Sequence, residues 1–419
     1  MIISKIPNSL KPQLVLSETG QERFSKPSAL VQEACYQIID PETEIVWGFV
    51  TIDNVQRGPG LGGIRMAQNI SLNEISRLAR VMTLKNSAAC LPYGGGKAGL
   101  IVKDPASLFN PQFKKELIDK FADALFDLEN YIPAPDMGTN EWDIQTIYEN
   151  HAKKLGTGIH NRGGAARPII KGGIPIDDWE LTAYGLFTAI QTVESVDKSF
   201  NLSKAKFVIQ GFGNVGAPTA LKLQKTGAIL VGASDIHTAL WNPNGLDVHE
   251  LINIRKEPGG LLNYSLDVKK RFSPGKLDWL LEAPCDILIP SARPDAITAK
   301  NVDRIQCRYI LQAANTPSSK PIEYYLHHRH NIISLTDFIV NSGGVIGCAV
   351  ERNMTIDNIY SDTVKNVGIK IYVENLIRNT VTKNVLEIYS RMKDRNGYIL
   401  RDAATDLAME RITSKEIWL

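Results

Sequence analysis

What most constrains the fold of this chain is a turn with regularly spaced glycines, Gly211-Phe212-Gly213-Asn214-Val215-Gly216. An apolar run at 206–210 precedes the turn and predicts a strand, and a helix that we expect to end near Gly227 follows it. Such glycines allow a tight turn and let the backbone approach a pyrophosphate, whose charge a helix N-terminus stabilises. Strand, turn and helix together predict a dinucleotide-binding unit of the Rossmann type.

An acidic residue stands where such a unit needs one. Asp235 lies 19 residues beyond Gly216, after a second predicted strand that runs through Val231. At this spacing a carboxylate accepts hydrogen bonds from the ribose hydroxyls and disfavours a 2′-phosphate. We therefore expect NAD as the cofactor, while NADP stays open.

Further apolar runs extend the same sheet. They lie at 285–289, 308–312 and 331–335 and alternate with segments of helical pattern. This alternation is typical of a doubly wound parallel sheet. We expect the cofactor domain to span 179–344.

Length and charge bound the rest of the chain. A chain of 419 residues exceeds what one core usually serves, so two domains are expected. The net charge is only +2, with 47 basic and 45 acidic residues, which indicates neither a nucleic-acid nor a membrane partner and favours a small molecule. The first ten residues lack the apolar run of a secretion signal, and five scattered cysteines fit reduced thiols, so we expect a cytoplasmic protein.

Three histidines raise the question of a metal. His327, His328 and His330 lie close together, but Arg329 stands among them and no partner ligands are nearby in the sequence. A solvated helix end explains them better. We expect no metal site.

The N-terminal half carries lysines in unusual places. Ser71 and Glu74 have capping-box spacing, and the helix that follows has an apolar stripe whose face Lys85 extends, which favours a cleft at the end of that helix. Lys97 follows three glycines in a segment, 92–99, that we interpret as a loop, as we do 57–65. Ala98 after Lys97 breaks the Walker pattern and argues against a triphosphate site.

Asp136 is the last polar candidate. Two prolines stiffen the chain before it, in the segment Pro133-Ala134-Pro135-Asp136. Taken alone, the aspartate is better explained by a helix cap or an Asx turn. A functional role for Asp136 depends on the other candidate residues that lie near it.

With these segments in hand, the chain resembles the glutamate, leucine, phenylalanine and valine dehydrogenases along most of its length. The resemblance rests on six segments in the same order, 57–65, 82–86, 92–99, 134–139, 211–216 and 341–345. It implies an α/β fold with an N-terminal substrate and oligomerisation domain over 1–178, a Rossmann domain over 179–344, and C-terminal helices over 345–419 that return to the first domain. It also implies a homo-oligomer, most often a hexamer.

The resemblance implies an activity and the residues behind it. The reaction is reversible oxidative deamination of an L-amino acid to a 2-oxo acid and ammonia. Lys85 is similar to the lysine that binds the substrate α-carboxylate, Lys97 to the one that activates water, and Asp136 to the proton-transfer acid. Thr182 and Asn315 match residues that contact the nicotinamide half of the cofactor.

The resemblance also bears on the substrate side chain. Glutamate enzymes place a lysine where this chain has Leu61, beside Gly62, and a serine where it has Cys348. A γ-carboxylate buried without those partners would be costly, so we expect an apolar substrate such as leucine, valine or phenylalanine. Glutamate is the alternative, with Arg162 or Arg167 replacing the missing cation.

Two hypotheses from other classes stay open. A catalytically silent regulatory paralogue would bind an amino acid and modulate a partner subunit, although the intact lysines and aspartate weigh against it. A plain nucleotide-binding module would not need those lysines. Turnover by the purified protein separates these hypotheses.

Overall fold

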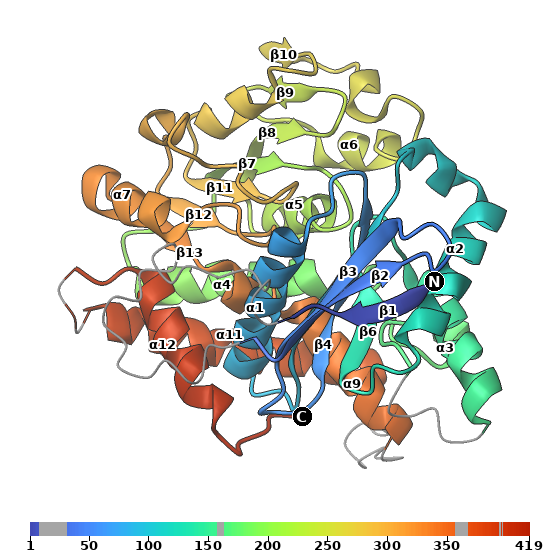
Figure 1. The fold of residues 1–419 in the computed structure, drawn as a ribbon. Coiled ribbons are helices and arrows are strands. Elements are labelled where there is room, and N and C mark those ends of the chain that lie inside the picture. The colour runs from blue at the N-terminus through green and yellow to red at the C-terminus, as the bar shows by residue number, and fades with distance from the viewer. Residues whose placement is uncertain (8–31, 157–162, 357–367, 394, 396) are drawn as a thin grey trace.

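Two β-sheets organise the molecule, and helices cover both (Figure 1). The computed structural model describes residues 1–7, 32–156, 163–356, 368–393, 395 and 397–419. Within these ranges no helix is long and apolar enough to cross a membrane. The mixture of helices and two sheets confirms the predicted α/β class.

The first sheet is built from the N-terminal part of the chain, in the order β1-β2-β3-β5-β4-β6. Only β4 pairs in parallel, with β5 on one side and β6 on the other. The strands are β1 (Ile2–Lys5), β2 (Ala34–Ile39), β3 (Val46–Asn54), β4 (Gly60–Ala67), β5 (Gly94–Ile101) and β6 (Tyr131–Pro135).

The interpretation of 57–65 and 92–99 as loops was wrong over most of both segments. Their glycines lie in β4 and β5. The physical reason is space: a Cβ on Gly95 would come within 2.2 Å of the Thr83 hydroxyl on helix α1 (Leu72–Ala88), and one on Gly62 within 1.7 Å of the Gly96 carbonyl. Here glycine serves close packing of a sheet against a helix, which composition alone does not distinguish from a turn.

The second sheet has the order β10-β9-β8-β7-β11-β12-β13. Five neighbouring strands are parallel, as predicted: β8, β7, β11, β12 and β13. Strands β9 and β10 add an antiparallel edge. The strands are β7 (Lys206–Gln210), β8 (Ile229–Ser234), β9 (Ala239–Trp241), β10 (Lys270–Phe272), β11 (Ile287–Pro290), β12 (Tyr309–Leu311) and β13 (Ile333–Leu335).

Helices cover the sheets and connect them. Besides α1, they are α2 (Pro111–Leu125), α3 (Glu141–Leu155), α4 (Leu181–Val196), α5 (Gly216–Gln224), α6 (Val248–Ile254), α7 (Lys320–His330), α8 (Asp337–Val340), α9 (Gly343–Ile356), α11 (Ile369–Lys393) and α12 (Leu400–Ile412). Short 3-10 turns include η6 (Ile169–Lys171). The three histidines lie in the last turn of α7, the helix end that we expected.

The C-terminal helices return to the N-terminal part of the chain. α12 packs on α1, and α11 packs on α4, α9 and α12 (Figure 1). Arg57, before β4, donates hydrogen bonds to the carbonyls of Arg411, Ser414 and Glu416. One large apolar cluster runs through elements of both sheets and these helices, so the two halves share a core.

Candidate active site

A cleft of about 450 Å³ lies where the two sheets face each other. Its walls come from β4, α1, β5 and the end of β6 on one side, and from the loops after β7, β11 and β12 on the other. The sequence-predicted residues on its walls are Leu61, Gly62, Lys85, Lys97, Asp136, Thr182, Asn214, Val215, Asn315 and Cys348. Gly211, Phe212, Gly213, Gly216 and Asp235 lie outside this lining.

The centre of the cleft holds an ion-pair cluster. Lys97 Nζ lies 2.8 Å from Asp136 Oδ2, and Arg65 Nε lies 3.1 Å from the same oxygen. Arg65 also pairs with Glu74 at 2.6 Å. Lys97 is only 2% exposed, so its charge is almost completely buried.

Local structure fixes this geometry. Lys97 projects from β5, and Asp136 follows directly on β6, whose Pro135 pairs with Ile64 of the parallel β4. The Thr139 hydroxyl accepts a hydrogen bond from Asp136 N and donates one to the Ile64 carbonyl. A Cβ on Gly63 would lie 2.7 Å from the Asp136 Cβ and 3.0 Å from Lys97 Nζ, so the pair needs a glycine beside it.

Burial and charge shift the ionisation of both partners. Burial lowers the pKa of Lys97 and Arg65 lowers it further, although Asp136 opposes the shift. Burial alone would raise the pKa of Asp136, but Lys97 and Arg65 hold it well below its usual range. A lysine with a lowered pKa beside an ionised carboxylate is suited to exchanging protons with a substrate.

Lys85 enters the cleft from the last turn of α1, whose N-cap is Ser71 as predicted. Its ammonium donates a 3.0 Å hydrogen bond to Asn315 Oδ1. Burial lowers the pKa of Lys85 to about 8, while Asp337 opposes this shift and Lys97 adds to it. At neutral pH the cleft therefore presents a cation that can bind a carboxylate.

The loop after β7 fits a dinucleotide. Gly211 has a φ of +94°, and a Cβ added to Gly213 would meet no atom within 4 Å, so the turn leaves open space above it. Val215, the N-cap of α5, makes no side-chain capping hydrogen bond, which leaves backbone N–H groups at the helix start. These are the features that a pyrophosphate requires.

Asp235 is more constrained than its spacing indicated. Its Oδ1 accepts hydrogen bonds from the backbone of His237 and Thr238, and its Oδ2 accepts one from Leu261, all at 2.8 Å. The carboxylate thus shapes its own loop, and a ribose would share it with three amides.

The cleft lining also includes apolar and acidic residues. Leu61, Val345 and Cys348 line the cleft together with Asp177, which accepts a 3.0 Å hydrogen bond from Asn214 Nδ2. Burial, Asp178 and Asp177 raise the pKa of nearby Glu141 to about 7.

Of the two alternative carboxylate-binding cations, Arg167 is engaged elsewhere. Arg167 Nε lies 2.8 Å from Glu351 Oε1, and both side chains are buried. Glu351 also accepts hydrogen bonds from the backbone of Ala166, Arg167 and Ile174. Arg167 is therefore committed to a structural ion pair, and Arg162 lies outside the described residues.

Sequence reasoning missed several residues of the cleft. Arg65 lies inside the glycine-rich segment 57–65, but no sequence pattern predicted its contact with Asp136. Asn341 donates to Asn315 and to the Ala313 carbonyl, and Asp177 lies on the wall. Only their place next to recognisable motifs could have indicated them.

Comparison with protein-family models places both halves of the chain. Residues 172–417 match the Glutamate/Leucine/Phenylalanine/Valine dehydrogenase model, and residues 31–153 match the dimerisation domain of the same family. A glutamate dehydrogenase of Aeropyrum pernix is 28% identical over 93% of this chain and 91% of that protein. An NADP-specific glutamate dehydrogenase of Saccharolobus shibatae is 31% identical over 93% of this chain and 89% of that protein.

Solved structures agree on the fold. A hetero-hexameric glutamate dehydrogenase of Thermus thermophilus, in a leucine-bound form, has a TM-score of 0.76 at 23% identity and covers 92% of this chain and 87% of its own. The enzyme of Peptoniphilus asaccharolyticus has a TM-score of 0.70 at 24% identity over 95% and 94%. The chain thus belongs to the glutamate, leucine, phenylalanine and valine dehydrogenase family, and it is an amino acid dehydrogenase.

Proposed function

We propose that this protein catalyses the reversible oxidative deamination of an L-amino acid to a 2-oxo acid and ammonia. The observation that carries the proposal is the buried Lys97–Asp136 pair, which shares one cleft with Lys85. A cation for the α-carboxylate and a proton-transfer pair at one end, next to a dinucleotide loop, are what this reaction needs.

Each side chain has a separate task in this scheme. Lys85 binds the substrate α-carboxylate and orients Cα. After Cα has lost its hydride, the neutral amine of Lys97 takes a proton from the water that attacks the resulting iminium carbon. Asp136 accepts the proton of the new hydroxyl group and passes it to the leaving amine, so that ammonia departs as the carbonyl forms.

The cofactor supplies the hydride acceptor when it is bound. The backbone of the turn 211–216 would hold the pyrophosphate, and Thr182 and Asn315 would contact the nicotinamide half. We propose NAD, because Asp235 disfavours a 2′-phosphate. The NADP-specific relative supports NADP as the alternative, and the three amides that already share Asp235 weaken the preference.

For the substrate side chain, the relatives support L-glutamate. Both archaeal proteins that match along the chain are glutamate dehydrogenases, which favours the alternative of the sequence analysis over the apolar prediction. Glutamate is therefore the first candidate.

The cleft favours a second candidate, an apolar amino acid such as leucine, valine or phenylalanine. Leu61 and Cys348 offer no hydrogen bond suited to a γ-carboxylate, Asp177 would repel one, and Arg167 is held by Glu351. Burying an unpaired carboxylate there would cost more than the roughly 2–7 kcal/mol of an unpaired neutral polar group.

One assay separates these readings. Purified protein is given NAD or NADP with each common L-amino acid in turn, and formation of the reduced nicotinamide is followed. Turnover of glutamate alone establishes the first candidate, and turnover of leucine, valine or phenylalanine without glutamate establishes the second. No turnover with any amino acid would contradict the enzymatic proposal and support a silent regulatory subunit.

We also propose that the protein is a cytoplasmic homo-oligomer, a hexamer in the first instance. The match of 31–153 to a dimerisation domain supports assembly. The Thermus thermophilus protein is a hetero-hexamer, so an assembly with a second type of subunit is the alternative. Light scattering of the purified chain alone gives the subunit number.

A further inference from the structure

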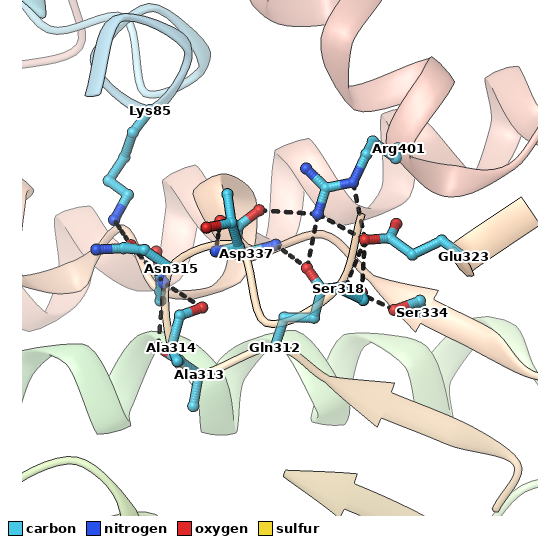
Figure 2. Close-up of polar contacts among 12 residues, drawn as sticks. Lys85, Gln312, Ala313, Ala314, Asn315, Ser318, Glu323, Ser334, Asp337 and Arg401 are labelled. Atoms are coloured by element: carbon cyan, nitrogen blue, oxygen red, sulfur yellow. Dashed lines mark hydrogen bonds and ion pairs between the residues drawn. The ribbon is translucent and has the colours of Figure 1, made fainter. Parts of the chain in front are cut away.

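Arg401, near the start of α12, reaches from the C-terminal helices into the cofactor-binding sheet (Figure 2). Its Nε donates to Glu323 Oε1 at 2.9 Å. A terminal nitrogen donates to Gln312 Oε1 at 2.8 Å and to Asp337 Oδ1 at 3.1 Å. One guanidinium thus binds three acceptors that come from three different elements.

Two of these acceptors hold the loop after β12. The second oxygen of Asp337 accepts a 2.7 Å hydrogen bond from Thr316 N, where the backbone is left-handed with a φ of +46°. The side-chain oxygen Oε1 of Gln312 also accepts a hydrogen bond from Asp337 N, and its Nε2 donates to Ser318, Ser334 and Glu323. The loop 312–318 is therefore fixed by side chains that Arg401 organises.

This loop carries the residue that meets Lys85. Asn315 Oδ1 accepts hydrogen bonds from Lys85 Nζ at 3.0 Å and from Asn341 Nδ2 at 3.2 Å. Figure 2 shows Arg401 bonded to Asp337, Gln312 and Glu323, and Lys85 bonded to Asn315. The backbone N–H of Thr316, next to Asn315 in the chain, connects the two groups through its hydrogen bond to Asp337. α12, which bears Arg401, also packs directly on α1, the helix that bears Lys85.

Two buried carboxylates make Arg401 difficult to replace. Asp337 is fully buried and Glu323 is 1% exposed, and Arg401 pairs with both. The groups that act on Lys85 are Asp337 and Asp136, which favour its charged form, and Lys97, which opposes it. Asp337 therefore acts on Lys85 in two ways: its hydrogen bond from Thr316 N holds the loop that carries Asn315, and its charge favours the charged form of Lys85.

We propose that Arg401 is a positioning residue: it holds Asp337 and the loop 312–318 so that Asn315 meets Lys85 at the substrate end of the cleft. This inference rests on the proposed function, in which Lys85 binds the substrate α-carboxylate. Arg401 touches neither substrate nor cofactor and acts through Asp337 and Gln312.

The first test is Arg401→Lys, which keeps the charge and removes the planar fork that serves three acceptors. We expect KM for the amino acid to rise about tenfold, because displacing a positioned group by a fraction of an ångström weakens binding. We expect kcat to change less, because Lys85 holds the carboxylate in the ground state and the transition state alike.

Arg411→Lys is the matched control. Arg411 lies on the same helix, is buried, and pairs with Glu387 at 2.9 Å, but it makes none of the contacts of the loop 312–318. It should lose comparable thermal stability with an unchanged KM. Equal KM changes in the two variants would mean that Arg401 is merely structural.

A second variant, Asp337→Asn, tests the effect of the Asp337 charge on Lys85. Removing this carboxylate favours the neutral amine of Lys85, so the alkaline limb of kcat/KM should move to lower pH. An unchanged limb would overturn the link between Asp337 and Lys85. This variant also serves if Arg401→Lys does not fold.

Crystal structures of both variants give a readout that does not need turnover. We expect the loop 312–318 to be displaced and the Lys85–Asn315 hydrogen bond to be lost in Arg401→Lys. An unmoved loop would overturn the inference even in an active enzyme. A displaced loop in a protein that turns over no amino acid would sustain the positioning role while the proposed function fails.

Discussion

Lys97 and Asp136 form an ion pair of 2.8 Å that two different parts of the first sheet bring together, a strand interior and a strand end. Arg65 adds a second cation to the same carboxylate. Two cations facing one buried acid favour the neutral form of the weaker base, which is the lysine. The cluster therefore keeps Lys97 ready to accept a proton.

Lys97→Ala should abolish this function while leaving the cofactor site intact. We expect kcat to fall by about 10²–10⁴, the usual contribution of a positioned base. Binding of the reduced nicotinamide, followed by its fluorescence, should stay within about twofold, because Lys97 lies in the first sheet, away from the turn that would hold the pyrophosphate. Lys103→Ala, at an exposed position next to the same strand, is the control. Equal loss of cofactor binding and turnover would disprove the role.

Asp136→Asn tests the acid of the pair. Removing its charge leaves Lys97 facing Arg65 without a counter-ion, so the pKa of Lys97 should fall further. We expect kcat to drop by about 10² or more, and the acid limb of the kcat profile to move to lower pH because the base loses its proton more readily. A limb that stays in place in stopped-assay pH profiles would show that another group is the base.

The pH dependence of substrate binding follows from Lys85, whose pKa burial lowers to about 8. Its protonated form binds the α-carboxylate, so KM for the amino acid should be flat below this value and rise up to about tenfold per pH unit above it. Lys85→Arg keeps its charge across this range and should flatten the rise. Initial-rate measurements from pH 7 to 10 decide the matter.

Leu61→Lys tests which side chain the cleft accepts. A lysine here would place a cation beside the apolar residues of the cleft and should raise the ratio of kcat/KM for glutamate over leucine by about tenfold or more. Leu61→Met is the control of similar volume, and its ratio should not change. If the wild-type protein already prefers glutamate, another cation binds the γ-carboxylate, and the new lysine should change the ratio little.

The ion pair of Arg167 and Glu351 should matter for stability. Glu351→Gln leaves a buried guanidinium without its counter-ion, which typically costs about 3–5 kcal/mol of unfolding free energy. Glu149→Gln removes an exposed pair with Lys171 and should cost less than about 1 kcal/mol. Urea denaturation of the two variants side by side measures both. Equal midpoints would mean that the buried pair contributes little.

The sequence predicted the second sheet better than the first. The strand, turn and helix at 206–224 were evident because period and glycine spacing agree there. In the first sheet, β4 and β5 are rich in glycine because close packing leaves no room for side chains. Without side chains that alternate between apolar and polar, the sequence shows no strand pattern there. The antiparallel β9 and β10 were not predicted, because Lys270 and Arg271 make β10 mostly charged and β9 stands between polar residues and a turn sequence. β12 and β13 are equally short, but their apolar runs indicated them.

The candidate site divides in the same way. Lys85 was visible because a charge continued an apolar stripe, and Asp136 because prolines framed it. Arg65 and Asn341 were not, because their importance comes from contacts with Asp136 and Asn315 across long stretches of sequence. Asp235 shows the opposite failure, since its spacing indicated a ribose ligand but not the three amides it already serves.

The return of α12 to α1 has a consequence for how the chain is made. The helix that carries Lys85 ends at Ala88, but the helix that covers it begins only at Leu400, so α1 is synthesised long before its partner. Until α12 is made, α1 exposes an apolar flank, which favours aggregation or binding to a chaperone. Nascent chains arrested before residue 400 should therefore bind such a chaperone, and chains extended past residue 412 should bind it less.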